Sequence, residues 1–370
     1  MGRPSIDIFC RVIDNFGDIG VCWRLARQLA RSPDVKAVRL WVDDLHSFAR
    51  IEPRLDCVAP AAVIEGVTIV HWAPSPPDLA PHDVVVEAFA CDPPPGYIQR
   101  MIKQKSLWIN LEYLSAEPWV ESCHALPSLQ ANGLQKAFFF PGFTAATGGL
   151  LREPDLLPER DDWIARPALR GQLLRDIGLP AKHVEALLGN TRQVLLFAYP
   201  QAPAAGLLQA LADDATPSVV LVPAGVCPDL PRGQHRSVYV HDMPFTDQAG
   251  FDRLLWSSDL NCVRGEDSLV RALWAGKPML WHIYPQDDNA HLIKLDAWLA
   301  QSPFQPLTGE LMRAWNGPDS LGCTALLSNA LAPTHWAEWQ AASAAWSRQL
   351  AKLPDLASTL IDFCLERVTE

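Results

Sequence analysis

The sequence lacks several patterns that mark common protein classes. Its nine cysteines form no CxxC pair, which argues against a disulfide framework and against a zinc ribbon. Its ten histidines show no HExxH or other paired spacing, so no metal site is expected. There is no dense lysine and arginine block, and the net charge is −11, so nucleic acid is not an expected direct partner. Because neither a signal-like amino terminus nor a run of eighteen uncharged apolar residues occurs, we expect a cytoplasmic protein without membrane contact. The scattered cysteines are expected to be reduced thiols in the core.

The length and composition favour two α/β domains. A chain of 370 residues exceeds the usual size of one core, and 49% hydrophobic residues can fill two. In the first part, strand-like runs alternate with helical segments, which is typical of a doubly wound parallel sheet. These runs are residues 6–13, 38–42, 67–72, 84–87, 107–111 and 137–140.

A proline-rich stretch without a clear strand follows residue 142, and we interpret it as the end of a first domain and a linker. The first domain with this linker is expected to span residues 1–185. A second Rossmann-like domain is expected over residues 186–335, with strands at 193–197, 218–222, 237–241, 259–263 and 278–283. Residues 336–370 have helical periodicity and are expected to pack back on the domains. Two Rossmann-like domains facing across a cleft, with a returning C-terminal helix, describe the GT-B architecture of many nucleotide-sugar glycosyltransferases.

The most informative segment is the junction Asp14-Asn15-Phe16-Gly17-Asp18, which joins the first strand to a helical pattern. Such a junction delivers its loop to the carboxyl edge of a parallel sheet, where ligands bind in open α/β folds. The loop is not a dinucleotide fingerprint, because it is poor in glycine and its two carboxylates would repel a pyrophosphate. The loop is instead predicted to bind a cation or a hydroxyl donor.

A second junction, Arg264-Gly265-Glu266-Asp267-Ser268, lies between an apolar run and a helix in the second domain. Gly265 permits a tight turn, and Asp267 or Ser268 can cap the helix. The helix amino terminus would offer free backbone donors to a diphosphate, with Arg264 adding charge-assisted bonds.

Aromatic and amide side chains in the second domain suit a pyrimidine base, which needs a face for stacking and an edge for hydrogen bonding. Gln248 and Phe251 are candidates for this base site. Tyr199 ends a predicted strand and is a third candidate at the same edge.

Long segments of the sequence resemble the EarP family of protein-arginine rhamnosyltransferases, which are GT-B enzymes that use dTDP-β-L-rhamnose to modify translation elongation factor P. The similarity covers nearly the whole chain. The segments that carry it are VIDNFGDIGVCWRLARQLA, EAFACD, LEYLSAE, RGEDSLVRALWAGKP and WHIYPQDDNAHLIKLDAW.

The resemblance implies roles for individual residues. It implies that Asp14, Asp18 and Glu266 are catalytic, with Asp18 as general base. It assigns donor contacts in the second domain to Tyr199, Gln248 and Phe251. We add the following donor contacts from the two junctions: Asn15, Phe16, Gly17, Arg264, Gly265, Asp267 and Ser268. On the acceptor side we expect Glu112 and Glu117.

The chemistry agrees with this assignment. The arginine guanidinium is protonated and delocalised at neutral pH, so a carboxylate must orient it and another, or the same one, must accept a proton. A single displacement at the anomeric carbon inverts it, so a β-linked donor gives an α-linked product. The helix terminus and Arg264 would stabilise the leaving diphosphate without a metal or other cofactor.

Simpler interpretations fit the same residues. Asp14 and Asp18 suit turn formation and helix capping, and residues 266–268 suit a capping box. Tyr199 and Phe251 suit a hydrophobic core. A Mg²⁺ ion held by Asp14 and Asp18, or by residues 287–288, is a rival to the metal-free site. A GT-B enzyme with another donor or acceptor, or a non-catalytic binding module, is the alternative function.

Overall fold

The computed structural model describes residues 2–14, 16–59, 61–286, 289–317 and 320–368, and the chain forms two compact units. The first comprises residues 1–153 and 352–370, and the second comprises residues 154–351. The sequence pattern placed this division near residue 185, but residues 154–185 belong to the second unit. Their helices pack there because α5 (Leu156–Ile164) and α6 (Pro167–Asp176) contact α9 (Gln248–Ser257).

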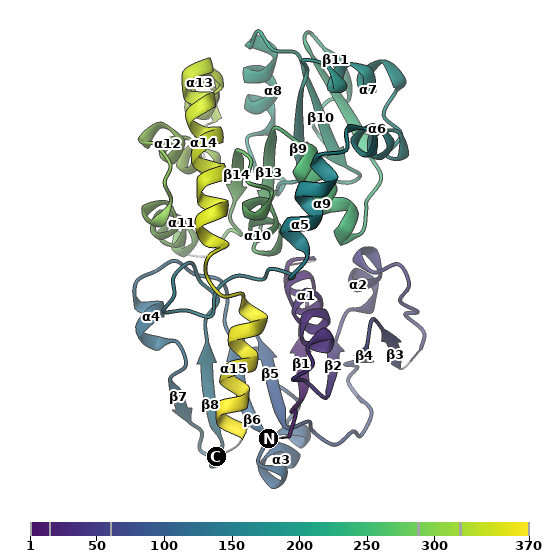
Figure 1. The fold of residues 1–370 in the computed structure, drawn as a ribbon, viewed down its shortest axis with the longest axis vertical. Helices are drawn as coiled ribbons and strands as arrows, with labels where there is room; N and C mark the ends of the chain where they lie inside the picture. The colour runs from purple at the N-terminus through teal and green to yellow at the C-terminus, as the bar shows by residue number, and fades with distance from the viewer. Residues whose placement is uncertain (1, 15, 60, 287–288, 318–319, 369–370) are drawn as a thin grey trace. The chain divides into compact units, whose positions relative to one another are not determined.

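The first unit is built on an eight-stranded sheet in which antiparallel strands lie only at the two edges. Helices α1 (Gly17–Arg31) and α15 (Leu356–Val368) lie on one face of the sheet (Figure 1). The spatial order of the strands is β3 (Ala61–Ile64), β4 (Val67–His71), β2 (Ala37–Val42), β1 (Ser5–Cys10), β5 (Val84–Ala88), β6 (Leu107–Leu111), β8 (Gln135–Phe139) and β7 (Pro127–Leu129). Shorter helices are α2 (Leu45–Ile51), α3 (Pro95–Gln104) and α4 (Trp119–Cys123).

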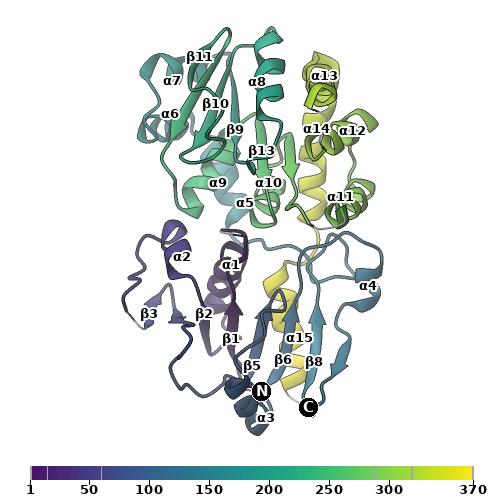
Figure 2. The same ribbon diagram turned by 180° about the vertical axis from the view of Figure 1, so that it is seen from behind.

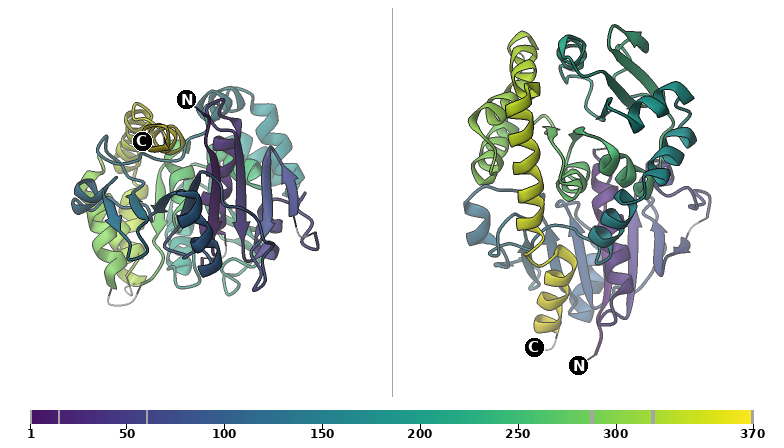
Figure 3. Two further views of the ribbon diagram at one scale, coloured as in Figure 1. Left: turned by 90° about the horizontal axis from the view of Figure 1, so that it is seen from below. Right: turned by 45° about the horizontal axis from the view of Figure 1, so that its top comes forward.

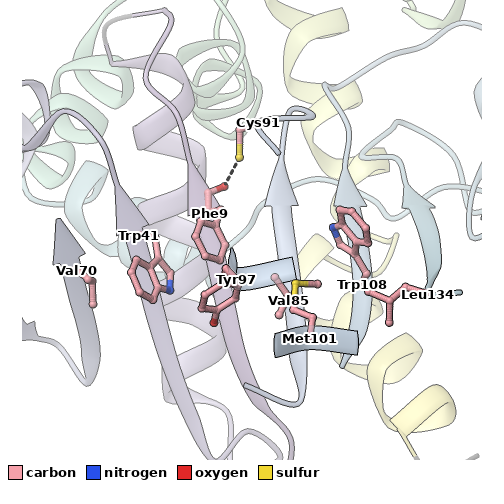
Figure 4. Packing of buried hydrophobic residues seen from close by; sticks show 9 residues of the cluster. All are labelled: Phe9, Trp41, Val70, Val85, Cys91, Tyr97, Met101, Trp108 and Leu134. Carbon is pink, nitrogen blue, oxygen red and sulfur yellow. Dashed lines mark hydrogen bonds between the residues drawn. The ribbon is translucent and has the colours of Figure 1, made fainter. Parts of the chain in front are cut away.

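Aromatic side chains fill the face of this sheet that α3 covers (Figure 4). Phe9 stacks on Trp41 at 5.1 Å between ring centroids, and Tyr97 of α3 meets both rings edge-on. The Cys91 thiol donates to the Phe9 carbonyl at 3.3 Å. Side chains two residues apart on a strand share a face, which is why Phe9 lies beside the buried Asp7 on β1.

The fully buried carboxylate of Asp7 connects the central strand β1 to neighbouring elements through hydrogen bonds. Arg39 of β2 donates to both carboxylate oxygens, from Nε at 2.5 Å and from Nη2 at 2.8 Å. Further donors are the Trp41 indole, the Tyr97 hydroxyl and the backbone amide of His82. These bonds connect β1, β2, α3 and the segment before β5 through one anion.

The second unit has a six-stranded sheet with one antiparallel edge strand, as seen from behind in Figure 2. Its strands in spatial order are β11 (Gly233–His235), β12 (Val238–Met243), β10 (Ser218–Pro223), β9 (Arg192–Leu196), β13 (Leu260–Arg264) and β14 (Met279–His282). Its helices besides α5, α6 and α9 are α7 (Ala181–Leu188), α8 (Ala204–Asp213), α10 (Asp267–Ala275), α11 (Ala290–Gln301), α12 (Pro306–Trp315), α13 (Ser320–Leu331) and α14 (Pro333–Leu350).

The C-terminal helical segment is divided between the two units. Helix α14 packs on α10 and α13 of the second unit, and Figure 3 shows it beside α11–α13. Helix α15 belongs to the first unit, where it contacts α1 and β6, and Phe363 meets Phe139 at 5.5 Å. No helix in the described part of the chain is long and apolar enough to cross a bilayer.

The expected strands are present, with two kinds of difference. Strand β1 ends at Cys10 instead of residue 13, because the Val12 amide turns to the Asp43 carboxylate at 2.9 Å and Ile13 is exposed. The short antiparallel strands β3, β7 and β11 were not expected, since three or four residues are too few to show periodicity.

Replacing Arg39 by methionine should destabilise the first unit by about 3–5 kcal/mol, because the Asp7 charge would remain buried without its cation. Urea unfolding measures this change. Arg31→Met is the matched control, since Arg31 pairs with Glu65 at the surface and such pairs contribute about 0–1 kcal/mol. Equal effects of the two substitutions would show that Asp7 does not depend on Arg39.

Candidate active site

The first candidate group lies on the turn between β1 and α1. The carbonyl of Asp14 accepts the Gly17 amide at 2.6 Å, and the Phe16 carbonyl accepts the Gly20 amide at 2.9 Å, which starts the helix. A Cβ at position 17 would lie 2.8 Å from an Asp14 carboxylate oxygen, so a larger residue there would require the Asp14 side chain to move. The turn is therefore compact enough to bring two acids to the same sheet edge.

Asp18 lies in the first turn of α1 and is buried, with 3% of its surface exposed. Its Oδ2 accepts the backbone amides of Ile13 and Asp14, each at 2.8 Å. Burial raises the pKa of this carboxyl above its ordinary value, and the charge of Asp14 adds to the rise; the two amides and the Tyr113 hydroxyl oppose it. A raised pKa suits a carboxylate that must accept a proton.

The remaining candidates around this turn have defined neighbours. The Phe16 ring lies 5.5 Å from the Arg50 guanidinium. Asn15 lies outside the described residues. Glu112 follows β6 and accepts the Asn110 side-chain amide at 2.6 Å, while Glu117 accepts the Ser115 hydroxyl at 3.0 Å. Both glutamates are half-buried.

The second candidate group surrounds the turn from β13 to α10. Gly265 has φ +60°, a left-handed conformation that glycine adopts without strain. The expected capping is wrong: the helix starts after Glu266, and no side chain caps it. Ser268 instead accepts the Arg264 amide at 3.0 Å and donates to the Arg264 carbonyl, because its hydroxyl reaches back one turn.

Asp267 is part of an ion network and lies beside the helix start. Its Oδ2 accepts Nε of Arg271 at 2.8 Å, and Nη1 of Arg271 donates to Asp252 of α9 at 2.8 Å. Arg271 is 2% exposed. This network holds the amino-terminal turns of α9 and α10 together.

Arg264 lies between two aromatic rings. Its guanidinium carbon is 4.5 Å from the Phe197 centroid and 4.8 Å from that of Tyr199. Tyr199 also meets His282 and Tyr284, at 5.5 and 5.6 Å between centroids. Burial lowers the pKa of His282 to about 4, with His291 and Arg264 adding to the effect, so this imidazole is neutral at pH 7.

The candidates for a base site lie at the start of α9, where the Asp247 side chain caps the helix by accepting the Gly250 amide at 2.8 Å. Gln248 is buried and Phe251 is half-buried. Phe251 meets Phe197 edge-on at 5.3 Å, so it joins the group that contains Tyr199 and Arg264.

The structure thus gathers the candidates into two groups, one on each unit. The sequence interpretation missed three aromatic neighbours, although each follows or ends a predicted strand and could have been found by that position. They are Phe89, Tyr113 and Phe197. Among the described residues, no three histidine, cysteine, aspartate or glutamate side chains are placed to hold a metal ion.

The chain is similar to known proteins over nearly its whole length. Residues 6–365 match the family described as Elongation-Factor P (EF-P) rhamnosyltransferase EarP. A protein-arginine rhamnosyltransferase of Pseudomonas putida is 46% identical, with 98% of both chains covered. One from Neisseria meningitidis is 38% identical, with 96% of both chains covered.

Solved structures show the same similarity. The chain matches a structure reported as the structural basis for EarP-mediated arginine glycosylation of translation elongation factor EF-P, with TM-score 0.65, 33% identity and coverage of 98% and 99%. The glycosyltransferase VinC in complex with dTDP matches with TM-score 0.54, 12% identity and coverage of 98% and 99%, which shows the fold alone. The expected GT-B fold is confirmed. By its sequence and its fold, the chain belongs to the EarP family of EF-P rhamnosyltransferases.

Proposed function

We propose that this enzyme transfers L-rhamnose from dTDP-β-L-rhamnose to an arginine side chain of elongation factor P, with inversion at the anomeric carbon. The whole-chain family match carries the reaction class. The donor follows from the family resemblance, and a group of aromatic side chains around Arg264 in the second unit supports it. Because the acceptor is a translation factor, the proposed place of the reaction is the cytoplasm.

The acceptor side is assigned to the first unit. An arginine guanidinium carries a positive charge and planar donors, so it requires carboxylates at its binding site. Asp14 and Asp18 lie on one turn at the carboxyl edge of the sheet, and Glu112 and Glu117 follow β6 at that edge. Asp18 accepts the proton, since burial raises the pKa of its carboxyl while hydrogen bonds keep it in place.

The donor side is assigned to the second unit. Phe251 offers a ring face to thymine, and Gln248 offers an amide for its edge. The start of α10 after Gly265 supplies backbone amides for the diphosphate, and Arg264 supplies positive charge. Tyr199 borders Arg264, while Asp267 and Ser268 shape the turn through Arg271 and the Arg264 backbone.

Asn15, Phe16 and Gly17 of the first unit are also proposed as donor contacts, and Glu266 at the start of α10 is proposed to contact the rhamnose. As the guanidinium nitrogen bonds to the anomeric carbon, one N–H proton passes to Asp18. The bond from the anomeric carbon to the phosphate oxygen breaks, and dTDP leaves with the electron pair. The positive end of the α10 dipole stabilises that charge.

Purified enzyme, elongation factor P and dTDP-rhamnose should give one added deoxyhexose on an arginine peptide, at an undiminished rate in excess EDTA. Helix α10 and Arg264 are expected to stabilise the diphosphate without a cation. Intact-mass and peptide mass spectrometry measure the product. Loss of transfer in EDTA that is restored by Mg²⁺ would replace this site by a metal-dependent one, and absence of any deoxyhexose would reject the reaction.

Asp18→Asn should reduce transfer by about two to four orders of magnitude while leaving dTDP-rhamnose affinity nearly unchanged, because it removes only the base. Stopped assays give the rate, and calorimetry gives the affinity. Asp34→Asn is the control, since Asp34 is exposed on the same unit. A parallel fall in affinity would assign Asp18 to donor binding or to folding.

Phe251→Ala should weaken dTDP and dTDP-rhamnose equally, by about 1–3 kcal/mol, since base stacking is independent of the sugar. Calorimetry measures both ligands. Trp336→Ala is the control: this half-buried ring lies on α14 and contacts Arg192 and Trp339 instead of the Phe197 group. Unchanged affinity in Phe251→Ala would remove this ring from the base site.

A further inference from the structure

A buried arginine on α10 lies between two carboxylates of the second unit. Arg271 has 2% of its surface exposed, so its guanidinium is almost completely removed from solvent. Its Nε donates to Oδ2 of Asp267 and its Nη1 donates to Oδ2 of Asp252, both at 2.8 Å. A guanidinium presents its donors in a planar fork, so one side chain can bind two carboxylates in fixed directions. The sequence patterns assigned no role to Arg271 or to Asp252.

The two carboxylates belong to the helices that carry the proposed donor site. Asp267 is the first residue of α10, where the backbone amides are assigned to the diphosphate, and it lies one helical turn before Arg271. Asp252 lies on α9 directly after Phe251, which is assigned to the thymine ring. Helices α9 and α10 contact each other. Arg271 therefore connects the helix of the proposed base site with the start of the helix assigned to the diphosphate.

A carboxylate at the position of Asp267 opposes the binding of a diphosphate at this turn. Its side chain is 13% exposed, so water screens its charge only in part. A negative side chain in the first turn stabilises a helix, but it repels an anion that binds at the same terminus. Glu266 is a second acid at this turn. Two acids at the start of α10 would offset the attraction that its backbone amides and Arg264 exert on phosphate.

Arg271 supplies the positive charge that balances Asp267. The ion pair is short and largely buried, so its charges interact more strongly than those of a surface pair. The second ion pair, with Asp252, holds the guanidinium in place, because the Asp252 side chain is also only 12% exposed. Two carboxylates and one guanidinium together carry a single negative charge, and loss of the guanidinium would leave two.

We propose that Arg271 is a positioning residue for donor binding: it balances the charge of Asp267, so that the first turn of α10 can accept a diphosphate. This inference rests on the assignment of the diphosphate to α10 in the proposed function. Arg271 acts through Asp267 and is assigned no contact with the sugar or the phosphate. Its effect therefore depends on the charge of the ligand, and it should be large for dTDP and small for thymidine, which has no phosphate.

The experiment measures both ligands with full-length variants at position 271. Arg271→Gln removes the positive charge and keeps a side-chain amide that can donate to one carboxylate. It should weaken dTDP binding about tenfold, because the Asp267 charge then acts on the diphosphate, while thymidine affinity stays within about twofold of wild type. Arg271→Lys retains the charge, so its dTDP affinity should lie closer to that of wild type. Calorimetry measures dTDP, and ligand-observed NMR measures thymidine.

The rescue variant combines Arg271→Gln with Asp267→Asn. Since both charges of the pair are then absent, dTDP affinity should return to within about threefold of wild type. This double variant also keeps the test valid if Arg271→Gln is unstable, because a dTDP affinity far below wild type would contradict the charge balance. Arg313→Gln is the matched control: Arg313 pairs with Asp296 at an exposed position of the same unit, and its loss should change neither affinity.

Equal losses for dTDP and thymidine in Arg271→Gln would overturn the inference, because they indicate a structural role for Arg271. Unchanged dTDP affinity in this variant would overturn it as well. Arg264→Ala separates the inference from the proposed function. If Arg264→Ala binds dTDP as tightly as wild type, the diphosphate does not lie at this turn and the donor assignment fails. A loss in Arg264→Ala with none in Arg271→Gln rejects the role of Arg271 alone.

Discussion

The buried Asp7 carboxylate is the interaction on which the first unit depends. It lies at the centre of an eight-stranded sheet and has no exposed surface. Arg39, Trp41 and Tyr97 donate to it, so a single anion sets the spacing of β1, β2 and α3. The same strand continues to Cys10 and then turns into the segment that bears Asp14 and Asp18. The hydrogen bonds that stabilise this sheet therefore also hold its carboxyl edge, with Asp14 and Asp18, in position.

A balance of opposing effects on one carboxylate connects this scaffold with the proposed chemistry. Burial and the neighbouring Asp14 favour the neutral form of Asp18, while two backbone amides and the Tyr113 hydroxyl favour the ionised form. The outcome is a pKa above the ordinary value, in a carboxyl that the backbone amides of Ile13 and Asp14 hold in place. In the second unit the corresponding group is cationic: the Arg264 guanidinium lies over the rings of Phe197 and Tyr199 and brings positive charge to these aromatic side chains.

Much of the fold follows from the sequence because the central strands of a parallel sheet are buried on both faces and appear as apolar runs. All runs expected in both units correspond to strands, and the three missed strands are short and lie at or near sheet edges. The boundary between the two units was harder to predict from the sequence. Helices α5–α7 carry no signal of which sheet they pack on, and the contacts of α5 and α6 with α9, and of α7 with α6, decide this.

By itself, the sequence determined the α/β alternation, the family, and the positions of Asp18 and Glu266 after strands, because these depend on local periodicity and on motifs. The tertiary structure alone decided which side chains meet. Only packing of β5 beside β6 brings Phe89 onto Tyr113, and only the turn of α10 directs Ser268 to the Arg264 backbone instead of the helix start. Burial of Asp18, and with it the raised pKa of its carboxyl, likewise arises only in the folded chain.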